Sequence, residues 1–207
     1  MPAKAGSMVV TGDELYYHGQ IAGHSGQGGG FWFTDLTQGF DFITFCLEYH
    51  ENLDDPDRTY WAIVNTGAVL GGVDTGTDPS DSTPDFDPLG YHAAYVFSEY
   101  QAGHLSAYTQ EAIQAAIWWY ESEIAFKGAG AALIAYVDSQ NPNETYGVSV
   151  LNLYKDRTLI PTGAQGYQYT GLAQDVTFKP VPEPSTLLLL GLSLTGLGLA
   201  ARKKNIR

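Results

Sequence analysis

Residues 87–124, "DPLGYHAAYVFSEYQAGHLSAYTQEAIQAAIWWYESEI", change the pattern of the chain from strand-like to helical. Asp87-Pro88 has the form of an N-cap followed by proline at the first helical position, and Gly103 is a typical helix stop. A second helix is expected to begin after a cap at Ser106 or Thr109. Its apolar side chains recur at helical spacing, and the expected buried stripe contains Ile113, Ala116, Ile117, Tyr120 and Ile124.

Short β-rich runs separated by glycine turns lie on both sides of this helical stretch. The expected strands are 7–12, 15–23, 30–36, 40–49 and 59–67 before it, and 146–154 and 166–178 after it. A third helix is expected over 130–140. The order of strands, about three helices and strands predicts an α+β fold, in which a β-sandwich or barrel carries a helical insertion.

The composition limits the classes of partner. The formal net charge is −13, and a nucleic-acid partner is not expected because phosphate binding needs a basic surface. The aspartates of the acidic segment 71–87 lack the spacing of a known calcium loop, and we interpret the segment as a solvated loop. No metal or other cofactor is expected. The run "GHSGQGGG", residues 23–30, is not followed by a phosphate-loop Lys-Ser/Thr and reads as a flexible turn.

The end of the chain, "VPEPSTLLLLGLSLTGLGLAARKKNIR", has three parts. A rigid Pro-Glu-Pro segment comes first. The uncharged run 185–201 follows, at the short limit for a helix that spans a bilayer. A basic cluster then forms a cytoplasmic stop. The residues of the first and third parts are Pro182, Glu183, Pro184, Arg202, Lys203, Lys204 and Arg207.

This tail resembles the PEP-CTERM sorting signal of Gram-negative bacteria. The resemblance implies export, processing by an exosortase in the inner membrane, cleavage near the Pro-Glu-Pro, and delivery to the cell surface or exopolysaccharide matrix. Residues 1–7 include a small-x-small sequence, Ala3-Lys4-Ala5, which we interpret as a possible remnant of a signal peptide. The expected domains are therefore 1–7, a surface domain over 8–179, and a sorting signal with a transmembrane helix over 180–207.

The only cysteine of the chain, Cys46, lies on the expected strand 40–49. On that strand it faces away from Phe45 and Leu47. A single cysteine forms no disulfide within the chain, so it is either a buried small hydrophobe or a thiol that pairs or reacts.

Gln114 lies at the edge of the apolar stripe of the second helix, one turn before Trp118. The pair Phe45-Cys46 and the run Gln114-Ala115-Ala116-Ile117-Trp118 together resemble the internal-thioester domains of Gram-positive surface adhesins. Those domains carry a cysteine after an aromatic residue on a strand and a helical Gln-x-Ala-hydrophobic-Trp motif.

The resemblance implies that Cys46 and Gln114 form a thioester with loss of ammonia, shielded from water by Phe45 and Trp118. An amine or hydroxyl on a surface or matrix partner would then displace Cys46 and remain attached to Gln114. This is a single-use reaction rather than enzymatic turnover.

Two other interpretations stay open. The first is a non-covalent structural or carbohydrate-binding protein of the exopolysaccharide matrix, with Cys46 reduced and buried. The second is a cysteine-dependent hydrolase, for which His50 is the nearest histidine in the sequence. No local sequence signature supports that hydrolase.

Overall fold

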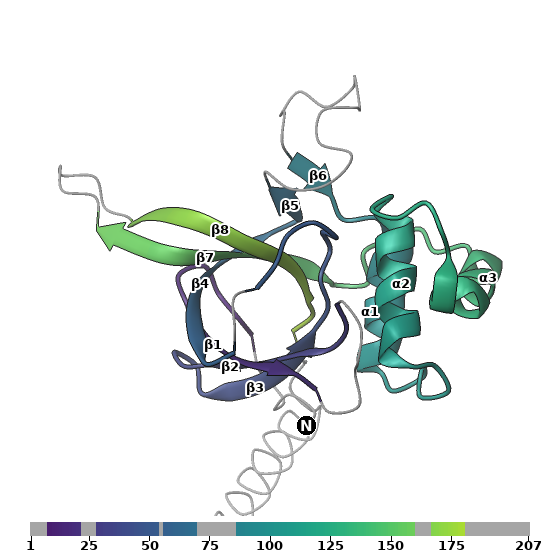
Figure 1. Cartoon of the computed structure of the whole chain (residues 1–207), viewed down its shortest axis with the longest axis horizontal. Helices are drawn as coiled ribbons and strands as arrows, with labels where there is room; N and C mark the ends of the chain where they lie inside the picture. The colour runs from purple at the N-terminus through teal and green to yellow at the C-terminus, as the bar shows by residue number, and fades with distance from the viewer. Residues whose placement is uncertain (1–7, 22–27, 54–55, 70–85, 160–166, 181–207) are drawn as a thin grey trace, which may run out of the picture.

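The computed structural model describes residues 8–21, 28–53, 56–69, 86–159 and 167–180. Strands precede and follow a helical segment, as the sequence predicts (Figure 1). The elements are β1 (Glu14–Gln20), β2 (Phe31–Asp35), β3 (Phe40–Thr44), β4 (Arg58–Asn65), β5 (Gly67–Val69), β6 (Phe86–Pro88), α1 (Tyr91–Gln101), α2 (Gln110–Tyr120), η1 (Gly128–Gly130), α3 (Ala131–Gln140), β7 (Ser149–Leu159) and β8 (Tyr167–Phe178).

Six antiparallel strands form one curled sheet in the order β3-β2-β1-β4-β7-β8. Its two edges approach each other just after β3, where Cys46 forms an isolated bridge with Val176 of β8. The Thr177 N–H also donates to the Phe45 carbonyl at 3.0 Å. The fold is therefore α+β with a curled, barrel-like sheet, and two sheets packed face to face are not seen among the described residues.

The helices lie together at one side of the curled sheet (Figure 1). α2 packs against α1, η1 and α3. Of the two caps expected for the second helix, the one at Thr109 is confirmed, because its hydroxyl accepts a hydrogen bond from the Ala112 N–H at 3.2 Å. Gly103 follows α1 with φ of 79°, a left-handed conformation that glycine adopts without strain.

Three expected element boundaries are wrong. Asp87-Pro88 does not start α1; these residues pair with β5 as part of β6, and Gly90 is the N-cap. The described part of 7–12 contains a turn and no strand. The strand expected over 40–49 ends at Thr44, because the chain leaves β2 there and continues toward β8.

Alternation of side chains along the segment after β3 divides the core into two parts. Cys46 packs with the aromatic side chains inside the curled sheet, among them Phe33, Phe42 and Tyr60. Phe45 packs on the opposite side, against the helices. This agrees with the prediction that Cys46 and Phe45 face opposite ways.

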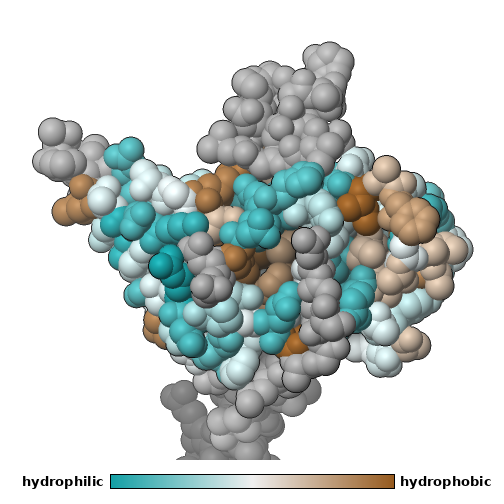
Figure 2. All heavy atoms as spheres, viewed as in Figure 1, coloured by the Kyte–Doolittle hydropathy of each residue, from teal (hydrophilic) through white to brown (hydrophobic). Residues whose placement is uncertain are grey.

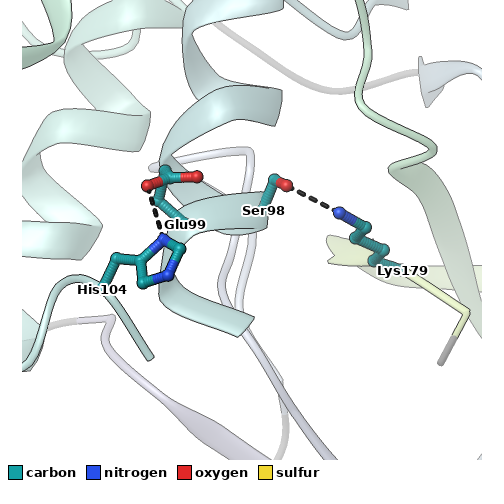
Figure 3. Close-up of polar contacts among 4 residues, drawn as sticks. All are labelled: Ser98, Glu99, His104 and Lys179. Atoms are coloured by element: carbon teal, nitrogen blue, oxygen red, sulfur yellow. Dashed lines mark hydrogen bonds and ion pairs between the residues drawn. The ribbon is translucent and has the colours of Figure 1, made fainter. Parts of the chain in front are cut away.

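The end of β8 is tied to the helical insertion (Figure 3). The Lys179 ammonium donates to the Ser98 hydroxyl of α1 at 2.6 Å. The next residue of α1, Glu99, contacts the His104 imidazole at 2.9 Å. The sheet and the helices are thus joined immediately before the expected sorting segment.

Among the described residues, no helix has both the length and the apolar composition to cross a bilayer. The expected transmembrane helix at 185–201, the Pro-Glu-Pro segment and residues 1–7 lie outside the described residues.

Candidate functional site

The side-chain amide of Gln114 lies against the backbone of Cys46. Its oxygen Oε1 accepts from the Cys46 N–H at 3.1 Å, and its nitrogen Nε2 donates to the Cys46 carbonyl at 2.8 Å. The Gly29 N–H donates to the same Oε1 at 3.0 Å. Gln114 is only 1 % exposed, so these three hydrogen bonds fix the plane of a buried amide.

Three separate parts of the chain therefore position this amide. α2 supplies Gln114 from its middle turn, facing the sheet. The bridge to Val176 holds Cys46 at the point where the sheet edges meet. The third part is the glycine-rich segment before β2, which places the Gly29 N–H over the amide oxygen.

Sequence reasoning missed the role of this glycine-rich segment, which read only as a flexible turn. Gly28 and Gly29 have positive φ angles of 68° and 107°. A Cβ on Gly28 would lie 2.5 Å from Trp118 and 2.6 Å from Gln114, closer than any real contact. The available signal was the run of three glycines, since backbone that approaches a side chain this closely requires glycine.

A pocket of about 200 Å³ lies on the Cys46 side of this site, and Cys46, but not Gln114, is among the residues that line it. Trp118 also lines it and contacts Tyr49 edge-on, with ring centroids 4.8 Å apart. The lining residues are Tyr17, Gln20, Gly28, Phe31, Cys46, Tyr49, Glu51, Asn52, Leu53, Trp118 and Gln174. Four of these eleven lining residues are aromatic.

Of the two expected shielding residues, only Trp118 lines this pocket. Phe45 is fully buried on the helix side, where its ring packs edge-on against Tyr100 at 4.9 Å. The aromatic wall on the Cys46 side comes instead from Tyr17, Phe31 and Tyr49. Phe45 thus belongs to the core beneath the helices.

Several buried carboxyl groups surround the segment that follows Cys46. Burial is the main cause that raises the pKa of Glu51 to about 7 and that of Asp175 to about 8. The Glu48 carboxyl is 1 % exposed, and neither of its oxygens has a hydrogen-bond partner among the described residues. Burial and the neighbouring Glu123 raise its pKa as well.

The Cys46 thiol shares this acidic environment. Burial, followed by the charges of Glu51, Glu48 and Asp175, raises its pKa well above the usual value for a thiol. The sulfur is therefore protonated at neutral pH. A thiol in this state is a weak nucleophile unless a neighbouring base takes its proton.

No group of histidine, cysteine and acidic side chains within the described residues is arranged to hold a metal ion. The aspartates expected in an acidic loop, apart from Asp87, lie outside the described residues. His50 is exposed and is not among the residues that line the pocket.

The geometry places two backbone N–H donors on the oxygen of a carboxamide whose neighbour is a buried thiol. Two such donors stabilise the negative oxygen that forms when a nucleophile adds to a carbonyl carbon. The arrangement is therefore suited to acyl transfer at the Gln114 side chain.

Residues 180–204 match the PEP-CTERM protein-sorting motif. The match includes the Pro-Glu-Pro residues and the basic residues up to Lys204. It makes the chain an exosortase substrate, exported and anchored transiently in the membrane before cleavage. No curated protein sequence and no solved structure matches the chain.

Proposed function

We propose that the exported domain, residues 8–179, forms an internal thioester between Cys46 and Gln114 and uses it to attach covalently to a surface or matrix partner. The partner supplies an amine or hydroxyl, and each molecule reacts once. The observation that carries the proposal is the Gln114 Oε1, which accepts hydrogen bonds from both the Cys46 and Gly29 N–H groups.

The proposed reaction begins with transfer of the Cys46 thiol proton to a base. The sulfur adds to the Gln114 Cδ, and the negative charge that develops on Oε1 lies between the two backbone donors. The Cδ–Nε2 bond then breaks and ammonia leaves. The hydrogen bond from Nε2 to the Cys46 carbonyl orients the amide before this step.

Burial of the site also supports the proposal. A thioester hydrolyses slowly in water, so it needs a site that limits access of solvent. Cys46 is 4 % exposed and Trp118 is 7 % exposed, and the pocket that they line gives a nucleophile a route to the Cys46 end of the bond.

The intact mass of the purified full chain tests this proposal, with Cys46→Ala and Gln114→Ala as controls. We expect only the wild type to be lighter than its sequence by one ammonia. Methylamine should add to the wild type and leave both variants unchanged. A wild type that keeps its full sequence mass, with an unmodified Gln114, would contradict the proposal.

A second candidate function is non-covalent binding of carbohydrate in the matrix, and a different face of the sheet favours it. Trp32 is 36 % exposed and stacks on His18 with centroids 4.0 Å apart. Tyr16 contacts the His18 ring edge-on, with centroids 4.8 Å apart. Titration with soluble polysaccharide, comparing wild type and Trp32→Ala, tests this function separately from the thioester.

A further inference from the structure

We propose that Glu51 is the proton-transfer residue of the thioester site, taking the proton from Cys46 during formation of the bond and from the incoming amine during its cleavage. This inference rests on the proposed function. It is carried by the position of Glu51 in the same pocket wall as Cys46 and by the backbone contact that holds it there.

Glu51 is the only carboxylate among the described residues that line the pocket. The other lining residues that ionise are Cys46 itself and two tyrosines. Burial raises the pKa of Tyr17 well above its usual value, so its phenol is not a base at neutral pH. Glu48 and Asp175 lie close enough to influence the thiol but do not line the pocket.

A backbone hydrogen bond from β8 holds Glu51 in the pocket wall to which Cys46 also belongs. One carboxylate oxygen, Oε2, accepts from the Asp175 N–H at 3.1 Å. Asp175 directly precedes Val176, the bridge partner of Cys46, and the Asp175 carbonyl accepts from the Leu47 N–H at 2.8 Å. The same short piece of β8 thus positions both the thiol and the carboxylate.

The reaction at Cys46 requires a base, and the Glu51 carboxylate can act as that base. The Cys46 thiol does not ionise by itself at neutral pH in its acidic, buried setting. A base whose own pKa is near neutrality transfers protons most effectively at that pH, and the pKa of Glu51 is raised to about 7.

The proton is conserved in both steps. During formation, the thiol proton passes to the Glu51 carboxylate, the Sγ–Cδ bond forms, and the same proton passes to Nε2 as ammonia leaves. During aminolysis, Glu51 takes a proton from the attacking amine. The new C–N bond replaces the C–S bond, and the proton passes to the Cys46 sulfur. Neither step needs an oxidant or a further reactant.

One more residue of the pocket, Gln174, offers a group to the incoming amine. The Gln174 Oε1 is buried and has no hydrogen-bond partner among the described residues, while its Nε2 donates to the Glu48 carbonyl at 2.9 Å. Because Gln174 lines the same pocket, we expect an amine N–H to donate to this oxygen while Glu51 removes a proton.

Glu121 provides a matched control. It is a buried carboxylate with a raised pKa, of about 8, whereas Glu51 is partly buried, and Glu121 accepts from the Gly90 N–H at 3.1 Å. That distance equals the one between Glu51 and the Asp175 N–H, but Glu121 does not line the pocket. A loss of buried charge alone would therefore affect both variants.

The test is the rate of methylamine addition to the full chain, followed by intact mass, for wild type, Glu51→Gln, Glu51→Asp and Glu121→Gln. At neutral pH we expect Glu51→Gln to slow the reaction roughly a hundredfold, Glu51→Asp to keep part of the rate, and Glu121→Gln to match wild type. The wild-type rate should also show an inflection near the Glu51 pKa of about 7, which Glu51→Gln removes.

Ionisable groups near Glu51 are Cys46, Glu48, Glu123, Tyr154 and Asp175, and they remain in every variant.

Glu51→Gln with the wild-type rate and pH profile would overturn this inference and leave the thioester intact. If Glu51→Gln does not fold, an unchanged rate in Glu51→Asp overturns it instead. A wild type without ammonia loss overturns both proposals.

Discussion

At the scale of single residues, the hydrogen bonds of Gln114 explain why a glutamine is buried between a helix and a sheet. An amide with 1 % exposure needs partners, and it finds them on the backbone of Cys46 and Gly29. The pairing of Cys46 with Gln114 was a prediction from two short motifs. The structure brings these residues into direct contact, while the covalent bond remains a proposal.

A substitution at Gly28 tests whether the glycine-rich segment before β2 positions the Gln114 amide. Gly28→Ala should lower the fraction of thioester and the melting temperature, because its Cβ collides with Trp118 and Gln114. Gly39→Ala is the matched control, since Gly39 has φ of 74° but no atom within 4 Å of an added Cβ. The control should lose only about 1 kcal/mol from its left-handed conformation. Equal thioester yields in the two variants, measured by intact mass, would contradict this role.

The two expected shielding residues should behave differently when changed. Trp118→Ala opens the pocket wall, so we expect faster hydrolysis of the thioester, measured as gain of one water over time. Phe45→Leu should lower the free energy of unfolding by about 1 kcal/mol through poorer packing, with no change in hydrolysis rate. Faster hydrolysis in Phe45→Leu as well would restore the shielding role first inferred for Phe45.

At the scale of elements, α2 links sequence pattern to site geometry. Its apolar spacing and its Thr109 cap are readable in the sequence, and both are present in the structure. The helix therefore presents Gln114 and Trp118 on adjoining turns, as predicted. What α2 contacts could not be predicted, because that depends on pairing between segments far apart in the chain.

Closure of the sheet is another feature that could not be predicted from the sequence. The bridge between Cys46 and Val176 joins residues from the two ends of the domain, and no local pattern signals it. The predicted start of α1 is also wrong, since Asp87-Pro88 has the form of a helix start but pairs with β5. In both cases a tertiary contact overrode a local preference.

Removal of the α2 cap should weaken the helix that carries Gln114. Thr109→Ala leaves the Ala112 N–H without its side-chain partner and should cost about 1 kcal/mol in the free energy of unfolding. Thr109→Ser retains the hydroxyl and should stay close to wild type. Urea unfolding of the three proteins checks this, and equal stability of Thr109→Ala and wild type would contradict the assigned cap.

At the scale of the whole molecule, hydrophilic and apolar residues are distributed unevenly over the surface. Hydrophilic residues cover much of the face viewed in Figure 2, whereas apolar residues line a hollow near its middle. The full chain has a net charge of −13, which disfavours binding to polyanions. The sorting motif at 180–204 implies that the protein is exported.

Buried carboxyl groups should make the whole fold less stable as the pH rises. The pKa values of Glu51, Asp175 and Glu121 are raised to about 7, 8 and 8 in the folded state. The folded protein therefore binds more protons than the unfolded chain, and this stabilisation is complete below about pH 4 and lost as the pH rises through 7 to 8. We expect the melting temperature to be several degrees higher at pH 5 than at pH 8.

Glu121→Gln should reduce this slope, because its neutral amide still accepts from the Gly90 N–H and no longer titrates. Calorimetry of wild type and variant across that range gives the comparison. A melting temperature that rises from pH 5 to pH 8 would show that these carboxyl groups are ionised without penalty in the folded protein.

The measurement that tests the central claim most directly is peptide mapping of the full chain after reaction with methylamine. The account predicts that tandem mass spectra place the methylamide on the Gln114 side chain and show Cys46 released as a free thiol. A label on any other residue, or no label with Gln114 unmodified, would contradict the thioester and leave a sorted surface protein whose single cysteine is only buried.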